Sequence, residues 1–180
     1  RLALVDYFAT LGFKVGAEIG VFDGYFSEHL CRMIPGLKLY SIDPWEVYPG
    51  YRDHKFVASM QAAEKKARER LAPFNVTIIK KYSVDAAKDI EDGSLDFVYI
   101  DANHEYTHVK ADIEAWAPKV RKGGVVAGDD YYQTRAGNLG VIRAVNDYAL
   151  EHGYDLQTTL WDLNDPVVDN QQPAWFWIQP

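Results

Sequence analysis

The chain has 180 residues, of which 48 % are apolar and 25 % are charged, the composition of an ordinary soluble globular protein. No apolar run approaches the roughly 20 residues that a membrane span needs, and a formal net charge of −7 argues against a dedicated nucleic-acid binder. The single cysteine, Cys31, excludes an intramolecular disulfide and favours a reducing, cytoplasmic location. We expect residues 1–180 to form one domain, whose N-terminus can be incomplete because the sequence starts at Arg1 rather than Met.

Strand-like and helix-like hydrophobic patterns alternate along the chain. They predict a strand at 14–20, a helix at 26–34, a strand at 37–43, a helix from about Phe56 to Leu71, and strands at 76–82 and 95–101. There follow a helix with Val109, Ile113, Trp116 and Val120 on one face, a strand at 123–130, a helix at 141–152, and a closing hairpin of 154–161 and 174–179. This alternation predicts an α/β fold with a mostly parallel sheet, to which the hairpin adds an antiparallel C-terminal strand.

Acidic residues stand at or near the expected ends of four strands. They are Glu18, Asp43, Asp101 and the pair Asp129 and Asp130. Because the carboxyl ends of parallel strands meet at one edge of the sheet, where ligands bind in such folds, we expect these carboxylates to share a rim.

The segment EIGVFDGYFS places Glu18, Gly20, Gly24 and Ser27 at the turn from the first strand to the first helix. Glycines let the backbone approach a ligand closely, and a helix N-terminus presents N–H groups. The spacing G-x-x-x-G differs from the G-x-G-x-x-G of dinucleotide sites, and the lysine of phosphate-binding loops is absent, which disfavours a dehydrogenase. A glycine turn without a ligand is the alternative.

The pattern E-x-G-x-x-x-G resembles the first motif of the class I S-adenosylmethionine-dependent methyltransferases. With LYSIDPW and LDFVYIDANHEYTHVKADIEAWAPKVRKGGVVAGDDY, the resemblance covers residues 15 to about 132 and extends to the metal-dependent O-methyltransferases of the catechol and macrolide-sugar types. It implies a Rossmann-like three-layer sandwich with a seven-stranded sheet, and S-adenosylmethionine bound at Glu18, Gly20, Gly24 and Ser27.

Three further residues are candidates for binding this cofactor. A carboxylate at Asp43 can accept hydrogen bonds from both ribose hydroxyls, although an aspartate before Pro44 also suits a turn. The resemblance places Ser83 at the adenine end. Trp45 either stacks on the adenine or belongs to the core.

The resemblance also implies a metal site and a general base. In the resembling enzymes Mg²⁺ is bound by an acid after the fourth strand and two residues after the fifth, which correspond to Asp101, Asp129 and Asp130. Carboxylate oxygens are ligands that Mg²⁺ prefers. His104 stands where these families place a basic residue, and a histidine suits removal of a proton from a metal-bound hydroxyl. Solvated acids and a turn histidine are the alternatives.

Residues His104 to His108 also match H-E-x-x-H, the zinc-protease motif. That motif needs both histidines on one continuous helix, whereas His104 lies only three residues beyond a strand end. We therefore expect no zinc site here.

The sequence thus predicts an S-adenosylmethionine-dependent O-methyltransferase, assisted by Mg²⁺ or a similar cation, that acts on a hydroxyl of a small molecule or sugar. No NPPY-like motif ends the fourth strand, which disfavours N-methylation of nucleic acid. A non-catalytic cofactor-binding module of the same fold is the alternative. Candidates for an aromatic acceptor wall are Trp45, Tyr48, Tyr51, Tyr131 and Tyr132.

Overall fold

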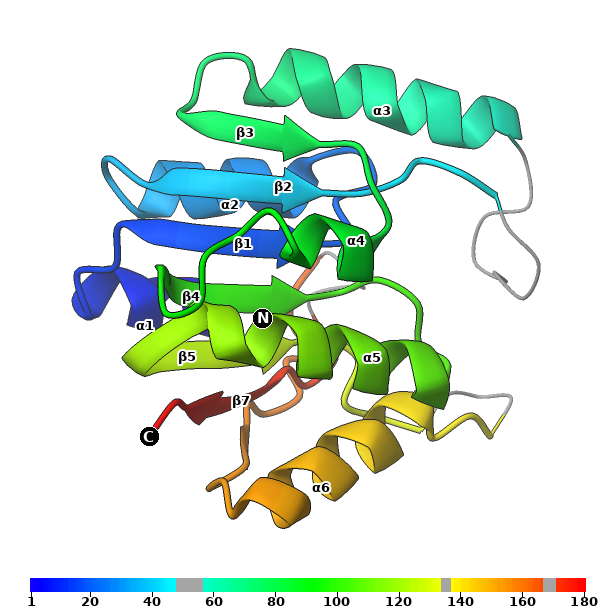
Figure 1. Ribbon diagram of the computed structural model, residues 1–180. Helices are drawn as coiled ribbons and strands as arrows, with labels where there is room; N and C mark the ends of the chain where they lie inside the picture. Colours follow the sequence, from blue (N-terminus) through cyan, green and yellow to red (C-terminus); the bar gives the residue numbers. More distant parts are fainter. Residues whose placement is uncertain (48–56, 134–136, 167–170) are drawn as a thin grey trace.

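The computed structural model describes residues 1–47, 57–133, 137–166 and 171–180, and it arranges them as helices on both faces of a central sheet (Figure 1). The first half contains α1 (Leu2–Thr10), β1 (Val15–Ile19), α2 (Tyr25–Met33), β2 (Lys38–Ile42), α3 (Val57–Leu71), β3 (Val76–Ile79) and α4 (Ser83–Ala87). The second contains β4 (Leu95–Ile100), α5 (Tyr106–Trp116), a 3₁₀ turn (Ala117–Lys119), β5 (Val120–Gly128), α6 (Gly140–His152), β6 (Gln157–Thr158) and β7 (Trp175–Ile178).

The sheet has seven strands in the order β3-β2-β1-β4-β5-β7-β6. Strands β1 to β5 pair in parallel, and β7 runs antiparallel to both β5 and β6. The predicted Rossmann-like, mostly parallel sheet with an antiparallel C-terminal strand is therefore confirmed. Strand order reverses between β1 and β4, so the carboxyl ends of these two strands flank the crevice where ligands bind in such sheets.

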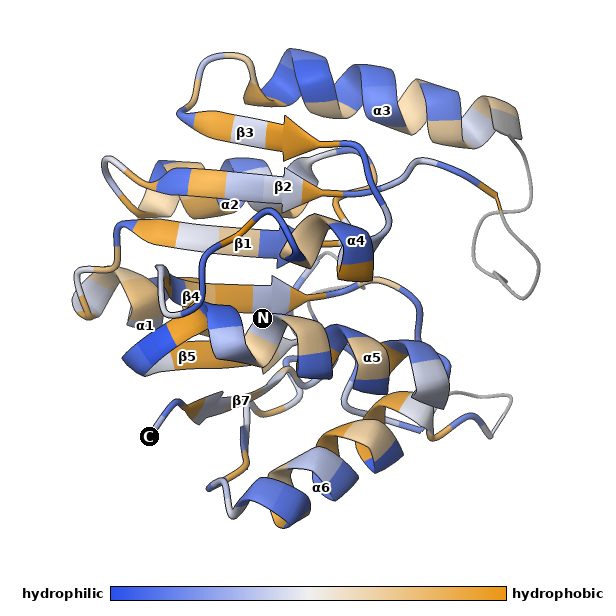
Figure 2. Ribbon diagram, in the orientation of Figure 1, coloured by the Kyte–Doolittle hydropathy of each residue, from blue (hydrophilic) through white to orange (hydrophobic). Residues whose placement is uncertain are grey.

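Two apolar clusters make the fold three layers deep. On one face of the sheet, Ile19 and Val98 pack with Ile113 of α5 and Val145 of α6. On the other face, strand residues pack with Phe8 of α1 and with residues of α2. Figure 2 shows that the strands are largely hydrophobic, whereas α3 is mostly polar. Burial on both faces explains the nearly continuous apolar runs of the central strands.

Several predicted boundaries shift. The helix expected to include Val120 ends at Trp116, because Pro118 cannot continue it and the chain turns into β5, which begins at Val120. The third strand ends at Ile79, and helices α1 and α4 had not been expected. Phe56, the expected start of α3, lies outside the described residues. Within the described ranges, no helix combines the length and apolar character needed to cross a membrane.

Candidate active site

Four neighbouring strands end in register, and this alignment builds the site. Ile19 of β1 pairs with Ile42 of β2 and with Ile100 of β4, and Ile100 pairs with Gly128 of β5. The next residues therefore emerge side by side at one edge of the sheet. They are Asp43, Gly20, Asp101 and Asp129. The expected rim exists, except that Glu18 lies inside β1 rather than at its end.

Glycine is required at two positions of the first turn, for reasons of packing. Gly20 has φ +92°, and a Cβ there would lie 1.9 Å from the carbonyl oxygen of Asp101. Gly24 caps α2 with φ +79°, and its Cβ would lie 3.0 Å from Cα of Ala67 in α3. Both glycines thus let neighbouring backbones approach, as left-handed and crowded positions demand.

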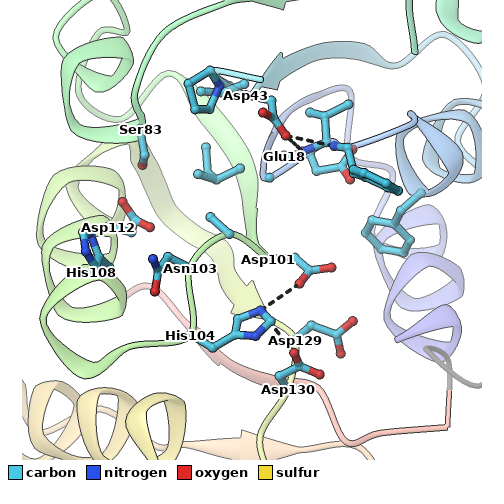
Figure 3. A pocket seen from close by; sticks show the side chains of 18 of the residues that line it. Glu18, Asp43, Ser83, Asp101, Asn103, His104, His108, Asp112, Asp129 and Asp130 are labelled. Carbon is cyan, nitrogen blue, oxygen red and sulfur yellow. Dashed lines mark hydrogen bonds and ion pairs between the residues drawn. The ribbon is translucent and has the colours of Figure 1, made fainter. Parts of the chain in front are cut away.

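Asp43 fastens two loops together (Figure 3). Its Oδ2 accepts hydrogen bonds from the backbone N–H groups of Val21 and Phe22, at 3.0 and 2.9 Å, and its Oδ1 accepts one from Trp45 at 2.7 Å. Phe22 and Trp45 both have positive φ, 49° and 46°, a conformation that non-glycine residues adopt at a cost. The carboxylate therefore stabilises these two turns.

Trp45 belongs to the core. Its side chain is 3 % exposed, packs with Val21 and Met60, and donates its indole N–H to the carbonyl of Phe22 at 2.7 Å. The stacking role considered for Trp45 does not fit this placement, because the ring is covered by α3 and does not line the cavity. The second reading of Trp45, as a core residue, fits.

Glu18 is a buried acid at the floor of the site. It accepts a hydrogen bond from the hydroxyl of Ser27, which lies 2.8 Å from the hydroxyl of Ser41. Burial raises the pKa of Glu18 to about 8, against the opposing effect of Ser27. Ser27 is itself fully buried, so it can influence a ligand only through Glu18.

A cavity of about 940 Å³ opens above these strand ends, near the upper end of the range usual for small-molecule sites, roughly 300–1,000 Å³. Four of the residues expected to bind the cofactor line it, namely Glu18, Gly20, Asp43 and Ser83, whereas Gly24, Ser27 and Trp45 do not. All four residues expected at the metal and base also line it, namely Asp101, His104, Asp129 and Asp130.

His104 faces two carboxylates at the rim. Its Nε2 lies 3.1 Å from Oδ2 of Asp130 and 3.5 Å from Oδ1 of Asp101 (Figure 3). Asp130 has φ 59°, a left-handed conformation that Asp tolerates better than most residues. Two carboxylates against one imidazole stabilise the imidazolium that forms when the ring accepts a proton.

The guanidinium of Arg1, which was not predicted from the sequence, contacts the second oxygen of Asp101. Nη1 of Arg1 lies 3.0 Å from Oδ2 of Asp101 and 2.8 Å from Oδ2 of Asp129, and the group stacks over Phe26. Burial and the charge of Asp101 raise the pKa of Asp129 to about 7. Burial opposes ionisation of Asp101 too, but His104 and Arg1 hold its pKa below the usual value.

The donor groups fit a divalent cation, with one change from the expected set. Ligand atoms of Asp101, His104 and Asp130 lie within 4.8 Å of one another, the one such cluster in the described ranges. His104 completes this cluster, whereas Asp129, one of the expected ligands, is not part of it and pairs with Arg1. Oδ1 of Asp129 is nevertheless buried without a hydrogen-bond partner in the described part of the chain. Buried polar atoms usually have a partner, so this oxygen suits the role of a cation ligand.

The H-E-x-x-H match does not form a zinc site. Helix α5 begins at Tyr106, so His104 and Glu105 precede it and only His108 is helical. The two histidines therefore do not share one helix face. Of the aromatic residues considered as an acceptor wall, Tyr132 lines the cavity, Tyr131 bonds Asn146 of α6, and Tyr48 and Tyr51 lie outside the described residues.

Asp112 also lines the cavity and was not predicted. It lies on the buried face of α5, between Val109, Ile113 and Trp116. The sequence did carry a signal, because an acid stands at i+3 from Val109 on an otherwise apolar helical stripe.

Comparison with known proteins identifies relatives. A family model described as a methyltransferase domain matches residues 17–131, more than half of the chain. Among curated proteins, the uncharacterized protein y4gI of Sinorhizobium fredii is 26 % identical over 154 residues, which cover 76 % of this chain and 16 % of that protein. The chain therefore spans about one sixth of that relative's length.

Solved structures share the fold. The O-methyltransferase from Bacillus cereus in complex with S-adenosylhomocysteine has a TM-score of 0.68 and 17 % identity, covering 99 % of this chain and 80 % of its own. TomG from Streptomyces achromogenes is an O-methyltransferase involved in tomaymycin synthesis, with a structure solved in complex with S-adenosylmethionine. It has a TM-score of 0.69 and 17 % identity, and the match covers 99 % of this chain and 79 % of TomG. An rRNA methylase from Streptococcus thermophilus has a TM-score of 0.65 and 15 % identity, and the match covers 98 % of this chain and 94 % of that one. At these identities the likeness establishes the fold alone.

Proposed function

The chain belongs to the class I S-adenosylmethionine-dependent methyltransferase family, and from that premise we propose that it methylates an oxygen of a small hydroxyl-bearing acceptor, with His104 as the general base. The observation that carries the proposal is the position of His104, whose Nε2 lies within 3.5 Å of two carboxylates at the mouth of the cavity. We also propose that residues 1–180 act as one unit.

The cavity offers a carboxylate for the ribose of the cofactor. The carboxylate of Asp43 can accept hydrogen bonds from the ribose hydroxyls. Gly20 lets the chain after β4 pass close to the first turn, and Glu18 at the floor accepts a hydrogen bond from Ser27 of α2. When bound, S-adenosylmethionine supplies an electrophilic methyl group on a cationic sulfur, so the protein mainly has to align and deprotonate the acceptor.

His104 would take the acceptor's hydroxyl proton as the oxygen attacks the methyl carbon. With the cofactor bound, a C–O bond to the acceptor would replace its C–S bond, and the acceptor's proton would end on the imidazole of His104. Asp101 and Asp130 face Nε2, so they would hold the N–H there and stabilise the positive charge while Nδ1 takes the acceptor's proton, as a carboxylate on one ring nitrogen supports the other in hydrolytic triads. The three side chains therefore form a proton-accepting unit next to the cavity.

A divalent cation such as Mg²⁺ would be held by Asp101 and Asp130, with Asp129 able to join if Arg1 moves away. Bound there, it would lower the pKa of an acceptor hydroxyl and orient its oxygen. We assign His104 to the proton rather than to the metal, because a cation on Nε2 would displace the proton that pairs there with the two carboxylates.

The acid-rich rim and the net charge of −7 favour a small acceptor over a nucleic acid, whose phosphates they would repel. The likeness to rRNA methylases concerns the fold and does not weigh against this. Tyr132 and Trp161, whose rings meet edge to face at 5.6 Å, offer an apolar flank beside the rim for a ring-shaped acceptor.

Two measurements test the proposal. Calorimetry should detect binding of S-adenosylhomocysteine, and turnover should be sought with catechols and sugars, with and without Mg²⁺. His104→Ala should retain cofactor affinity and lower kcat by about 10²–10⁴-fold, the usual contribution of a general base. His29→Ala, a histidine on α2 that does not line the cavity, is the control. Absence of S-adenosylhomocysteine binding would refute the proposed function. An unchanged rate in His104→Ala would refute the role of His104 as the general base.

A further inference from the structure

Asp112 is a buried carboxylic acid that the proposed methyl transfer does not use. It is 5 % exposed, and every other buried residue of α5 is apolar. Burial raises its pKa to about 6, so holding a charge there is unfavourable unless something interacts with it. Its side chain nonetheless lines the cavity.

Asp112 lies near Ser83 and Trp116. The indole N–H of Trp116 donates to Oγ of Ser83 at 2.9 Å, and Ser83 partly offsets the rise that burial causes in the pKa of Asp112. An ionised carboxylate can only accept hydrogen bonds, so Asp112 suits a donor group of a ligand.

The position of Asp112 fixes which part of a ligand it can meet. Figure 3 shows Ser83 and Asp112 on the opposite side of the pocket from Asp129 and Asp130. If the ribose lies at Asp43 and the reacting sulfur faces the rim, the adenine ring of the cofactor must extend toward α4 and α5. Apolar side chains for a flat ring also line the cavity, among them Ile42, Pro44, Val84 and Ala102.

We propose that Asp112 accepts a hydrogen bond from the exocyclic amino group of the cofactor's adenine and selects a 6-amino over a 6-oxo purine. The inference rests on the proposed function and replaces Ser83 with Asp112 as the residue that reads the base. A 6-oxo purine presents an acceptor where adenine presents a donor. Its 6-oxo oxygen would therefore face an oxygen of the Asp112 carboxylate, and no hydrogen bond could form between them.

The test compares S-adenosylhomocysteine with its 6-oxo analogue, S-inosylhomocysteine, by calorimetry. The wild-type protein should prefer the adenosyl compound by about 10- to 100-fold, the factor for one hydrogen bond to a charged group. In Asp112→Asn the side-chain amide can donate to a 6-oxo group. The ratio of the affinities for the adenosyl and inosyl compounds should therefore fall close to one. Asp85→Asn is the control, because it removes an exposed carboxylate from the neighbouring helix α4 and should leave the preference unchanged.

The outcomes separate the two proposals. Failure of both compounds to bind the wild type would refute the proposed function. Equal binding of both by the wild type would overturn the role of Asp112 without any variant. If Asp112→Asn weakened both compounds alike, the role of Asp112 would be structural only, and the inference would be wrong.

Discussion

Replacing Glu18 by Gln should stabilise the protein increasingly as the pH rises. Burial lifts the pKa of Glu18 to about 8 from an ordinary value of 4.5, so the folded protein holds a proton that the unfolded chain releases. In that window the folded state binds more protons, and raising the pH therefore favours unfolding. Glutamine is close in shape to the protonated acid and never ionises.

The size of the effect follows from the same shift. Each pH unit between about 4.5 and 8 costs the wild type about 1.4 kcal/mol relative to a neutral side chain. The gap in unfolding free energy between Glu18→Gln and wild type should thus widen by about 3 kcal/mol from pH 5 to pH 8. The prediction concerns this slope, because the amide changes the bond with Ser27 by a constant amount.

Urea denaturation of both proteins at several pH values gives the gap directly. Asp112 and Asp129 also have raised pKa values, but both proteins contain them and their contributions cancel. Glu69→Gln, which removes an exposed carboxylate on α3, should track the wild type at every pH. Parallel curves for Glu18→Gln and wild type would show that Glu18 is ionised in the fold at neutral pH.

Three further predictions concern neighbouring residues. Arg1→Gln should raise the affinity for Mn²⁺ about 10-fold by calorimetry, because the cation no longer competes with a charge-assisted bond to Asp129; unchanged affinity would mean that Arg1 does not guard the site. Gly20→Ala should cost about 2–5 kcal/mol by urea denaturation, from strain and overlap. Gly12→Ala, also at positive φ but in open space, should cost only about 1–2 kcal/mol, and equal losses would contradict the packing argument. Asp43→Ala should weaken S-adenosylhomocysteine by about 1.5–3 kcal/mol and also lower stability, since three backbone N–H groups lose their acceptor; unaltered binding would leave Asp43 a purely structural role.

Local pattern in the sequence was enough to predict the sheet and the rim. Alternating strand and helix periodicity requires parallel pairing, and parallel pairing brings strand ends together. The acids Asp43, Asp101 and Asp129 could therefore be assigned to one edge before any contact was known. The same reasoning predicted that the H-E-x-x-H segment would not be a continuous helix, since it follows a strand end so closely.

Tertiary structure decided what those residues touch. Arg1 meets Asp101 and Asp129 across 100 and 128 positions of sequence, and no periodicity links groups so far apart. Gly20 proved necessary because the backbone of Asp101 and Ala102, just after β4, passes beside it, and not because of its own turn alone. Periodicity assigns a side chain to a face of its own strand or helix, whereas charge pairing and hydrogen bonding depend on which other faces pack against it, and only the folded chain fixes that.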